Sequence, residues 1–198
     1  YARTLLAVSH RWEHPDAPDS AGVQQRAGWA HVRAHPEIEA VWYDYWCMAQ
    51  GERTPAERVQ FKYMLSNVNL LYLGMRVLVL ADISYLSRFW TQFEAFLSMR
   101  KVTASGLDAA RADERRVTVA CIHNAPAAFS DALFGMWSNK SAAEAHGILM
   151  KPDVKVTNQS DKDMQLPKIL QFNSWVSIVH TLELPWRIPI ANLLHTYC

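Results

Sequence analysis

One acidic residue, Glu94, follows a tryptophan, Trp90, by four positions in a segment that is expected to be helical. Residues four apart lie on the same face of a helix, so the carboxylate and the indole are expected to lie side by side. A carboxylate next to an indole is partly desolvated and can act on a cationic sugar centre. The alternative is a surface position for Glu94, with Trp90 at least half buried in the core.

The elements around Glu94 predict where it lies. Residues 76–81 form an apolar run that is typical of a buried strand, and residues 82–87 form a short loop that leads into the helix. Ligands of open α/β sheets bind at the carboxyl ends of the strands. We therefore expect Glu94 close to the carboxyl end of this strand.

Two further apolar runs end in residues that can bind a ligand. These residues are Ser9, His10, Arg11 and Trp12 after the first run, and Asp44 and Trp46 at the end of the second. The carboxyl ends of neighbouring parallel strands meet at one edge of a sheet. The sequence thus predicts one candidate site that is built from three loops.

The order of apolar runs and amphipathic segments predicts the fold class. Strands are expected at residues 3–8, 39–44, 77–80, 116–122 and 154–157. Helices are expected at residues 22–35, 54–73, 87–101, 126–137 and 166–182. Strands that alternate with helices indicate a flavodoxin-like doubly wound parallel sheet of about five strands, with helices on both faces. We expect one α/β domain over residues 1–183 and an irregular C-terminal tail over residues 184–198.

The composition argues against several classes of protein. The 20 basic and 19 acidic residues are scattered and give a formal charge of +1, so no nucleic-acid partner is expected. No run approaches the roughly 18 apolar residues of a membrane span, so no membrane partner is expected either. Three cysteines, Cys47, Cys121 and Cys198, lack the spacing of a metal site or of a disulfide framework. These features favour a cytoplasmic protein.

The absence of several known motifs argues against further classes of enzyme. The seven glycines form neither a dinucleotide-binding fingerprint nor a P-loop, and no G-x-S-x-G elbow is present. The segment from His10 to His14 matches an inverted zinc-protease motif, but that motif needs a helix, and here Pro15 follows at once. His31 and His35 are four apart on a predicted helix and lack a nearby third ligand. No metal site is predicted.

The three strand ends together resemble a known family, the Toll/interleukin-1 receptor (TIR) domains. Ser9-His-Arg resembles the strand-end signature S-[FYH]-R of that family. The segment that ends at Asp44 resembles its second strand, and the segment from Arg88 to Glu94 resembles its S-R-W-C-x-x-E helix. The residues from Trp42 onward also resemble the W-I-D-x-x-C-I-N-Q signature of the related heterokaryon-incompatibility domain.

The resemblance covers about half of the chain, from Leu5 to Met99, and it is incomplete. Phe89 stands where many members have Arg or Ser, and Thr91 replaces the common Cys after the tryptophan. The loop after Trp12 is unusually rich in proline. These departures concern the geometry of the substrate loops more than the fold.

The resemblance implies cleavage of the bond between nicotinamide and ribose in NAD⁺, with Glu94 as the catalytic residue. An oxocarbenium-like ribose develops when that bond breaks, and a nearby carboxylate stabilises it, orients the ribose hydroxyls or attacks it. NAD⁺ is then a substrate, and no cofactor is predicted. A defence or signalling role and a homo-oligomer are also implied.

The same resemblance assigns the other residues to substrate binding. Arg11 can pair with the diphosphate, and Asp44 can hydrogen-bond a ribose hydroxyl. An aromatic face can hold the cationic nicotinamide by stacking. The aromatic candidates are Trp12, Trp46 and Trp90, and Ser9 and His10 complete the substrate-binding set.

Other functions and structural roles fit the same residues. A non-catalytic TIR-like module would signal by self-association alone. A nucleoside deoxyribosyltransferase-like enzyme would share the architecture and a glutamate nucleophile. Arg11 can instead be a structural partner of Asp44 or Glu13, and Asp44 can cap the segment that follows it.

Overall fold

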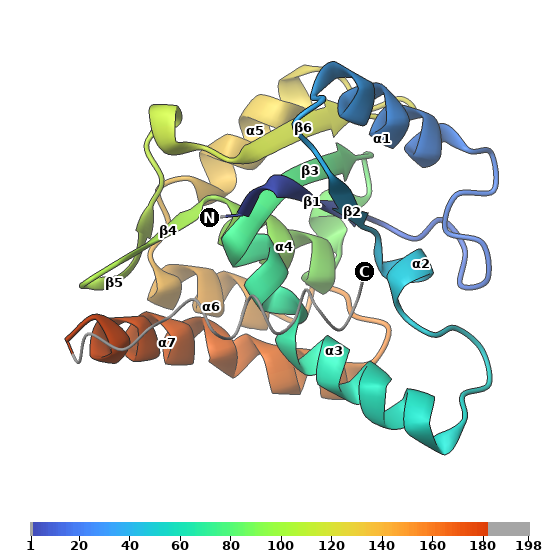
Figure 1. Cartoon of the computed structure of the whole chain (residues 1–198). Helices are drawn as coiled ribbons and strands as arrows, with labels where there is room; N and C mark the ends of the chain where they lie inside the picture. The colour runs from blue at the N-terminus through green and yellow to red at the C-terminus, as the bar shows by residue number, and fades with distance from the viewer. Residues whose placement is uncertain (1, 182–198) are drawn as a thin grey trace.

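The computed structural model describes residues 2–181 and has an α/β architecture (Figure 1). The main sheet of this part has four parallel strands in the order β2-β1-β3-β6. They are β1 (Ala2–His10), β2 (Ala40–Trp42), β3 (Met75–Ala81) and β6 (Val117–Cys121). Two further strands, β4 (Arg100–Thr103) and β5 (Gly106–Ala109), form a separate antiparallel hairpin.

Seven α-helices surround the sheet within residues 2–181. They are α1 (Val23–Ala34), α2 (Asp44–Cys47), α3 (Pro55–Gly74), α4 (Phe89–Ser98), α5 (Ala128–Trp137), α6 (Ala142–Met150) and α7 (Gln159–Thr181). Two short 3₁₀ helices, η1 (Tyr85–Ser87) and η2 (Ala112–Glu114), precede α4 and β6. The start of α3 follows from local chemistry, because Thr54 and Glu57 form a reciprocal capping box and Pro55 occupies the first turn.

The predicted α/β class and the first four predicted strands are confirmed, and the sheet is roughly compatible with a flavodoxin-like fold. The fifth predicted strand, at residues 154–157, is wrong. Lys155 makes only an isolated bridge, because its N–H and carbonyl pair with Ser87 and Phe89 at the start of α4. The count of about five strands is therefore not confirmed, since the described sheet has four.

The structure differs from the sequence prediction at other places. In the first half of the chain, the second strand ends at Trp42 and the unpredicted helix α2 begins at Asp44. The β4–β5 hairpin and α6 were not predicted. The last helix begins at Gln159 rather than at residue 166, and Pro167 lies inside it. The predicted C-terminal tail, residues 184–198, lies outside the described residues.

Alternate residues of the central strands point into two hydrophobic clusters on opposite faces of the sheet. Ala7 and Val79 belong to the larger cluster, and Val8 and Leu80 belong to the smaller one. In Figure 1, α3, α4, α6 and α7 lie on one side of the sheet and α1 lies on the other. We call these sides the α4 face and the α1 face.

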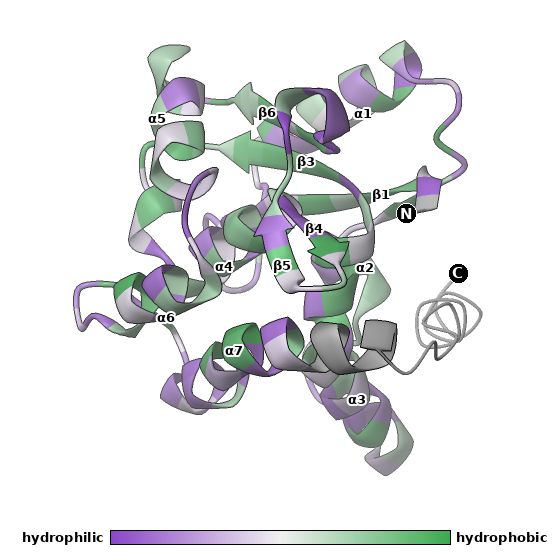
Figure 2. Cartoon of the chain, turned by 90° about the vertical axis from the view of Figure 1, so that its left-hand side faces the viewer, coloured by the Kyte–Doolittle hydropathy of each residue, from purple (hydrophilic) through white to green (hydrophobic). Residues whose placement is uncertain are grey.

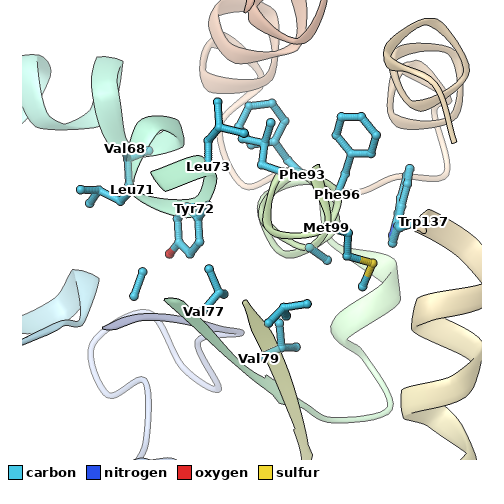
Figure 3. Close-up of a cluster of buried hydrophobic side chains, with 14 of the residues drawn as sticks. Val68, Leu71, Tyr72, Leu73, Val77, Val79, Phe93, Phe96, Met99 and Trp137 are labelled. Carbon is cyan, nitrogen blue, oxygen red and sulfur yellow. The ribbon is translucent and has the colours of Figure 1, made fainter. Parts of the chain in front are cut away.

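Helix α4 is the centre of the larger cluster. Figure 3 shows it end-on between α3 and Trp137, with Phe93 and Phe96 pointing outward from it and Val79 of β3 nearby. Every residue of α4 except Trp90 is buried. The rotation of α4 about its axis is therefore set by packing on nearly all sides, which fixes where Glu94 points.

The hydropathy of the elements agrees with this layering. Figure 2 shows β1 and β3 as mostly apolar strands, and shows polar and apolar residues in turn along α3 and α7. Such alternation is typical of helices that pack on one side and meet water on the other. No helix within residues 2–181 is long and apolar enough to cross a membrane.

Candidate functional site

The predicted site residues other than Trp90 lie at the carboxyl edge of the sheet, in two networks on opposite faces. Strand β1 lies between β2 and β3. The chain therefore passes from β1 to β2 on one side of β1, and then crosses to β3 on its other side. Such a switch point opens a crevice at the strand ends, where ligands bind in sheets of this class. Ser9 and His10 are the last two residues of β1. Because consecutive residues of a strand point to opposite faces, they lead into two different networks.

Glu94 lies at the centre of a buried polar network on the α4 face. Ser9 Oγ donates a hydrogen bond to Glu94 Oε2 at 2.6 Å and lies 2.6 Å from the hydroxyl oxygen of Tyr85. Since a serine hydroxyl has a single proton, Tyr85 is the donor to Ser9. Glu94 is 8% exposed, so the surface alternative for this residue is wrong.

Burial controls the ionisation of this network. It raises the pKa of Glu94 well above the usual range of a carboxyl, and the hydrogen bond from Ser9 opposes that shift only in part. Burial, followed by the charge of Glu94, also raises the pKa of Tyr72 and Tyr85 well above their usual values. The neutral forms of all three groups are therefore favoured. The hydroxyl of Tyr72 donates to the carbonyl of Val8.

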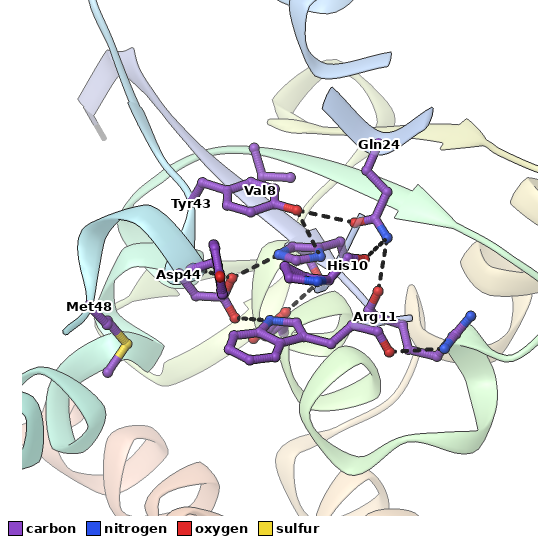
Figure 4. A network of polar contacts seen from close by, with 12 residues as sticks. Val8, His10, Arg11, Gln24, Tyr43, Asp44 and Met48 are labelled. Atoms are coloured by element: carbon purple, nitrogen blue, oxygen red, sulfur yellow. Dashed lines mark hydrogen bonds and ion pairs between the residues drawn. The ribbon is translucent and has the colours of Figure 1, made fainter. Parts of the chain in front are cut away.

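Asp44 organises a second network on the α1 face (Figure 4). Its Oδ1 accepts a hydrogen bond from His10 Nε2 at 2.8 Å, and its Oδ2 accepts one from Trp12 Nε1 at 2.8 Å. The His10 ring stacks on Tyr43, with ring centroids 4.2 Å apart, and Tyr43 stacks on Trp46. Trp46 is 56% exposed, so this network reaches the surface.

Arg11 is held by an acid that the sequence did not single out. Its Nε and Nη2 both donate to Asp82 Oδ2, at 2.7 and 2.5 Å. The structural alternative for Arg11 named Asp44 or Glu13, and the partner is neither. The ion pair joins the ends of β1 and β3 across the switch point.

Trp90 lies apart from both networks. Its ring contacts Phe89 and Phe93, and its side chain lies near the carboxyl of Asp161 in α7. Trp90 therefore packs α4 against the start of α7. The desolvation that the sequence expected from Trp90 comes to Glu94 from its burial near Tyr72 and Tyr85 instead.

Four residues of the site were missed by the sequence analysis: Tyr72, Asp82, Tyr85 and Gln24. Asp82 carries a signal that could have identified it, since it follows a buried strand directly, as Asp44 nearly does. Gln24 fixes the loop after β1 by donating to the carbonyls of Arg11 and Pro18. No local pattern marks the two tyrosines, because their partners are distant in the sequence.

Of two cavities in the described part of the chain, the smaller borders the α1-face network through Gln24, Tyr43 and Trp46. This smaller cavity, of about 50 Å³, is apolar and lies under α1, where Gly28, Trp29 and Trp46 are among its lining residues. The other, of about 340 Å³, lies at the amino ends of the strands. Glu94 lines neither of them.

No group of three or more His, Cys, Asp or Glu residues within residues 2–181 is arranged to hold a metal ion. Comparison of the chain with models of known protein families, with curated proteins and with solved structures gave no match.

Proposed function

We propose that this chain cleaves the bond between nicotinamide and ribose in NAD⁺, as a TIR-like glycohydrolase or cyclase, with Glu94 as the catalytic carboxyl. The observation that carries the proposal is the 2.6 Å hydrogen bond from Ser9 Oγ to Glu94 Oε2. It joins the strand-end motif of β1 to the helix motif of α4 at the edge where ligands bind in this class of sheet.

The reaction requires an ionised carboxylate beside the ribose while positive charge develops on the sugar. In the unliganded chain, burial favours the neutral form of Glu94 by raising its pKa. NAD⁺ has a cationic nicotinamide ring, and a nearby opposite charge lowers the pKa of a carboxyl. Substrate binding would itself promote ionisation of Glu94, and Ser9 would keep the carboxylate oriented.

The α1-face network would supply the other contacts with the substrate. The exposed ring of Trp46 can stack on the nicotinamide cation. Asp44 keeps 31% of its side chain exposed and can accept a hydrogen bond from a ribose hydroxyl. Arg11 retains partial exposure beside Asp82 and can direct an N–H group to a phosphate oxygen.

Access to Glu94 is the step that the proposal must explain. Glu94 is nearly buried, and the neighbouring hydroxyl of Ser9 is occupied by Tyr85 from the segment between β3 and α4. We expect this segment to move when copies of the chain assemble. Specific activity should then rise with protein concentration.

The test is release of nicotinamide from NAD⁺ by purified protein over a range of protein concentrations. Glu94→Gln keeps the shape of the side chain and should lower turnover by about 100-fold or more, the lower range for loss of a catalytic acid or base. Ser9→Ala should cause a smaller loss. Glu39→Gln, at an exposed glutamate, is the matched control and should keep full turnover.

Melting temperatures of all variants would show that they fold. Undiminished turnover by a folded Glu94→Gln variant would remove Glu94 from the mechanism. Exchange of nucleobases without cleavage of NAD⁺ would indicate a deoxyribosyltransferase-like enzyme instead.

The burial of Glu94 favours a second candidate, a non-catalytic TIR-like module that acts by self-association. This candidate predicts that the chain assembles with rising concentration and that no nicotinamide is released at any stage of assembly. Sedimentation and the NAD⁺ assay on the same samples distinguish the two candidates.

A further inference from the structure

The larger cavity lies at the edge of the sheet opposite to Glu94. It has a volume of about 340 Å³ and is open at the amino ends of β1, β3 and β6. Each of these strands brings arginine side chains to it. They are Arg3 in β1, Arg76 in β3, and Arg115 and Arg116 immediately before β6. Neighbouring parallel strands thus bring four arginine residues to the lining of one cleft.

The acidic residues of the cleft are already neutralised from outside it. Asp113 accepts hydrogen bonds from Arg111, and Glu114 accepts them from Lys101. Neither Arg111 nor Lys101 lines the cleft. The arginines of the cleft therefore leave it with an excess of positive charge.

The four arginines differ in the hydrogen bonds and ion pairs that they make with the rest of the chain. Arg116 donates to the carbonyls of Tyr72 and Met75 and is structural. Arg76 pairs with Glu37 at 2.5 Å, and both side chains of that pair are partly exposed. Arg3 and Arg115 are exposed, and no carboxylate within residues 2–181 pairs with either. Arg3 can turn to a ligand without loss to the fold. The guanidinium of Arg115 lies over the Phe134 ring, 4.7 Å from its centroid, and would exchange that contact for one with the ligand.

Two histidines at the end of α1 form one wall of the cleft. The rings of His31 and His35 lie 4.2 Å apart, and His35 Nδ1 hydrogen-bonds the carbonyl of His31. Burial, then the charges of His35 and Arg76, lower the pKa of His31, whereas Glu37 raises it. A bound anion would oppose the effect of the positive charges and favour protonated histidines.

We propose that this cleft binds a small molecule that carries a diphosphate or a similar multivalent phosphate group. Guanidinium groups match phosphate oxygens in pairs, and the cleft is lined by Arg3, Arg76 and Arg115, which are all at least partly exposed. The volume lies in the range of small-molecule sites. The overall charge of +1 and the two acids at the rim give no extended basic surface for a nucleic acid. The site is independent of Glu94 and of the proposed cleavage of NAD⁺.

The test is titration of the purified chain with inorganic pyrophosphate by calorimetry in low salt, at two pH values near 6 and 8. Arg3→Gln combined with Arg115→Gln should weaken binding by about tenfold or more, since two charge-assisted contacts are lost. Thr118→Glu, which adds an acid to the exposed lining, should weaken it similarly. Arg33→Gln with Arg58→Gln changes the net charge equally at exposed sites outside the cleft and should leave affinity within about twofold.

The titrations at two pH values test whether His31 and His35 contribute to binding. The charged groups around His31 and His35 come from several elements. They are Arg3 from β1, Glu37 after α1, Arg76 from β3, Asp113 and Glu114 from η2, and Arg115 and Arg116 between η2 and β6. The quantity to compare is the ratio of the affinity at the lower pH to the affinity at the higher pH. This ratio should be larger for the wild type than for a variant that carries both His31→Gln and His35→Gln. This comparison cancels the titration of pyrophosphate itself.

The outcomes separate the two proposals. Tight pyrophosphate binding that Glu94→Gln leaves unchanged and that the cleft variants weaken supports the phosphate site, whatever the NAD⁺ assay gives. Absence of binding at millimolar pyrophosphate, or equal weakening by the control arginine variants, overturns it.

Discussion

Two consecutive residues of β1, Ser9 and His10, contact regions that differ greatly in how deeply they are buried. Ser9 bonds Glu94 on the α4 face, beneath α4, whose three phenylalanines are completely buried. His10 bonds Asp44 on the α1 face, where Trp46 and Trp29 remain about half exposed. One acid of the candidate site is thus held in the core, whereas the other lies near water.

The helices explain this difference. All but one residue of α4 are buried, but Gln24 is the one residue of α1 that is buried. Gly28 and small side chains face the sheet from α1, and a cavity of about 50 Å³ remains beneath it. The α4 face therefore fixes the position of Glu94, whereas the α1 face leaves its aromatic residues free to adjust to a ligand.

The largest expected effect concerns the stability of the two faces. Phe93→Ala removes a fully buried ring from the α4 face and should cost about 3–5 kcal/mol of unfolding free energy. Trp29→Ala removes a larger side chain from the α1 face but should cost less than about 1 kcal/mol, because that ring is 51% exposed. Urea denaturation of the two variants measures the difference. Similar losses of unfolding free energy in the two variants would show that packing under α1 contributes as much to stability as packing under α4.

The second prediction uses the pH dependence of stability to examine the depth of Glu94. Burial raises its pKa in the folded state above the value of about 4.3 in an unfolded chain. Between these two pKa values the folded state binds more protons than the unfolded state, so the stability of the wild type falls as pH rises. The Glu94→Gln variant has no titrating carboxyl at this position. Its unfolding free energy should therefore increase relative to that of the wild type as the pH is raised from about 4 toward neutrality.

Urea denaturation at a series of pH values measures this gain. Glu39→Gln, at an exposed glutamate, should give a curve parallel to that of the wild type. A parallel curve for Glu94→Gln as well would mean that the carboxyl is solvated, and the contrast between the two faces would then be lost.

The same contrast explains how much of the fold could be predicted. Strands β1, β3 and β6 are short apolar runs, and α3 has its cap and proline in the local sequence. The β4–β5 hairpin depends instead on a distant contact, because the N–H of Leu107 donates to Asn173 of α7. Gly106 at its turn has a φ of +125°, and a Cβ there would lie 2.6 Å from the Asn173 side chain. No pattern within residues 100–109 contains that information.

The site was predictable in its location but not in its contacts. The convergence of three strand ends follows from the parallel sheet alone. The side of α4 that meets β1 depends on the packing of the whole helix, so spacing alone paired Glu94 with Trp90 rather than with Ser9. Likewise, the charge of Arg11 predicted an acidic partner, but only the register between β1 and β3 identifies Asp82.

The smallest expected effect comes from filling the space beneath α1. Gly28 lies inside the helix, and a Cβ added there would meet nothing within 4 Å. Gly28→Ala should therefore stabilise the chain by about 0.5–1 kcal/mol, through the higher helix propensity of alanine. Gly147→Ala in α6, where a Cβ also meets open space, is the matched control and should give a similar gain.

Larger side chains at position 28 would then separate propensity from packing. Gly28→Leu should retain the gain if α1 is as loosely packed as the cavity indicates, since the added atoms would enter existing apolar space. A loss of more than about 1 kcal/mol for Gly28→Leu, with Gly28→Ala stabilising, would mean that α1 cannot adjust. The α1 face would then be as rigid as the α4 face, and aromatic contacts with a substrate would have to form without movement of this helix.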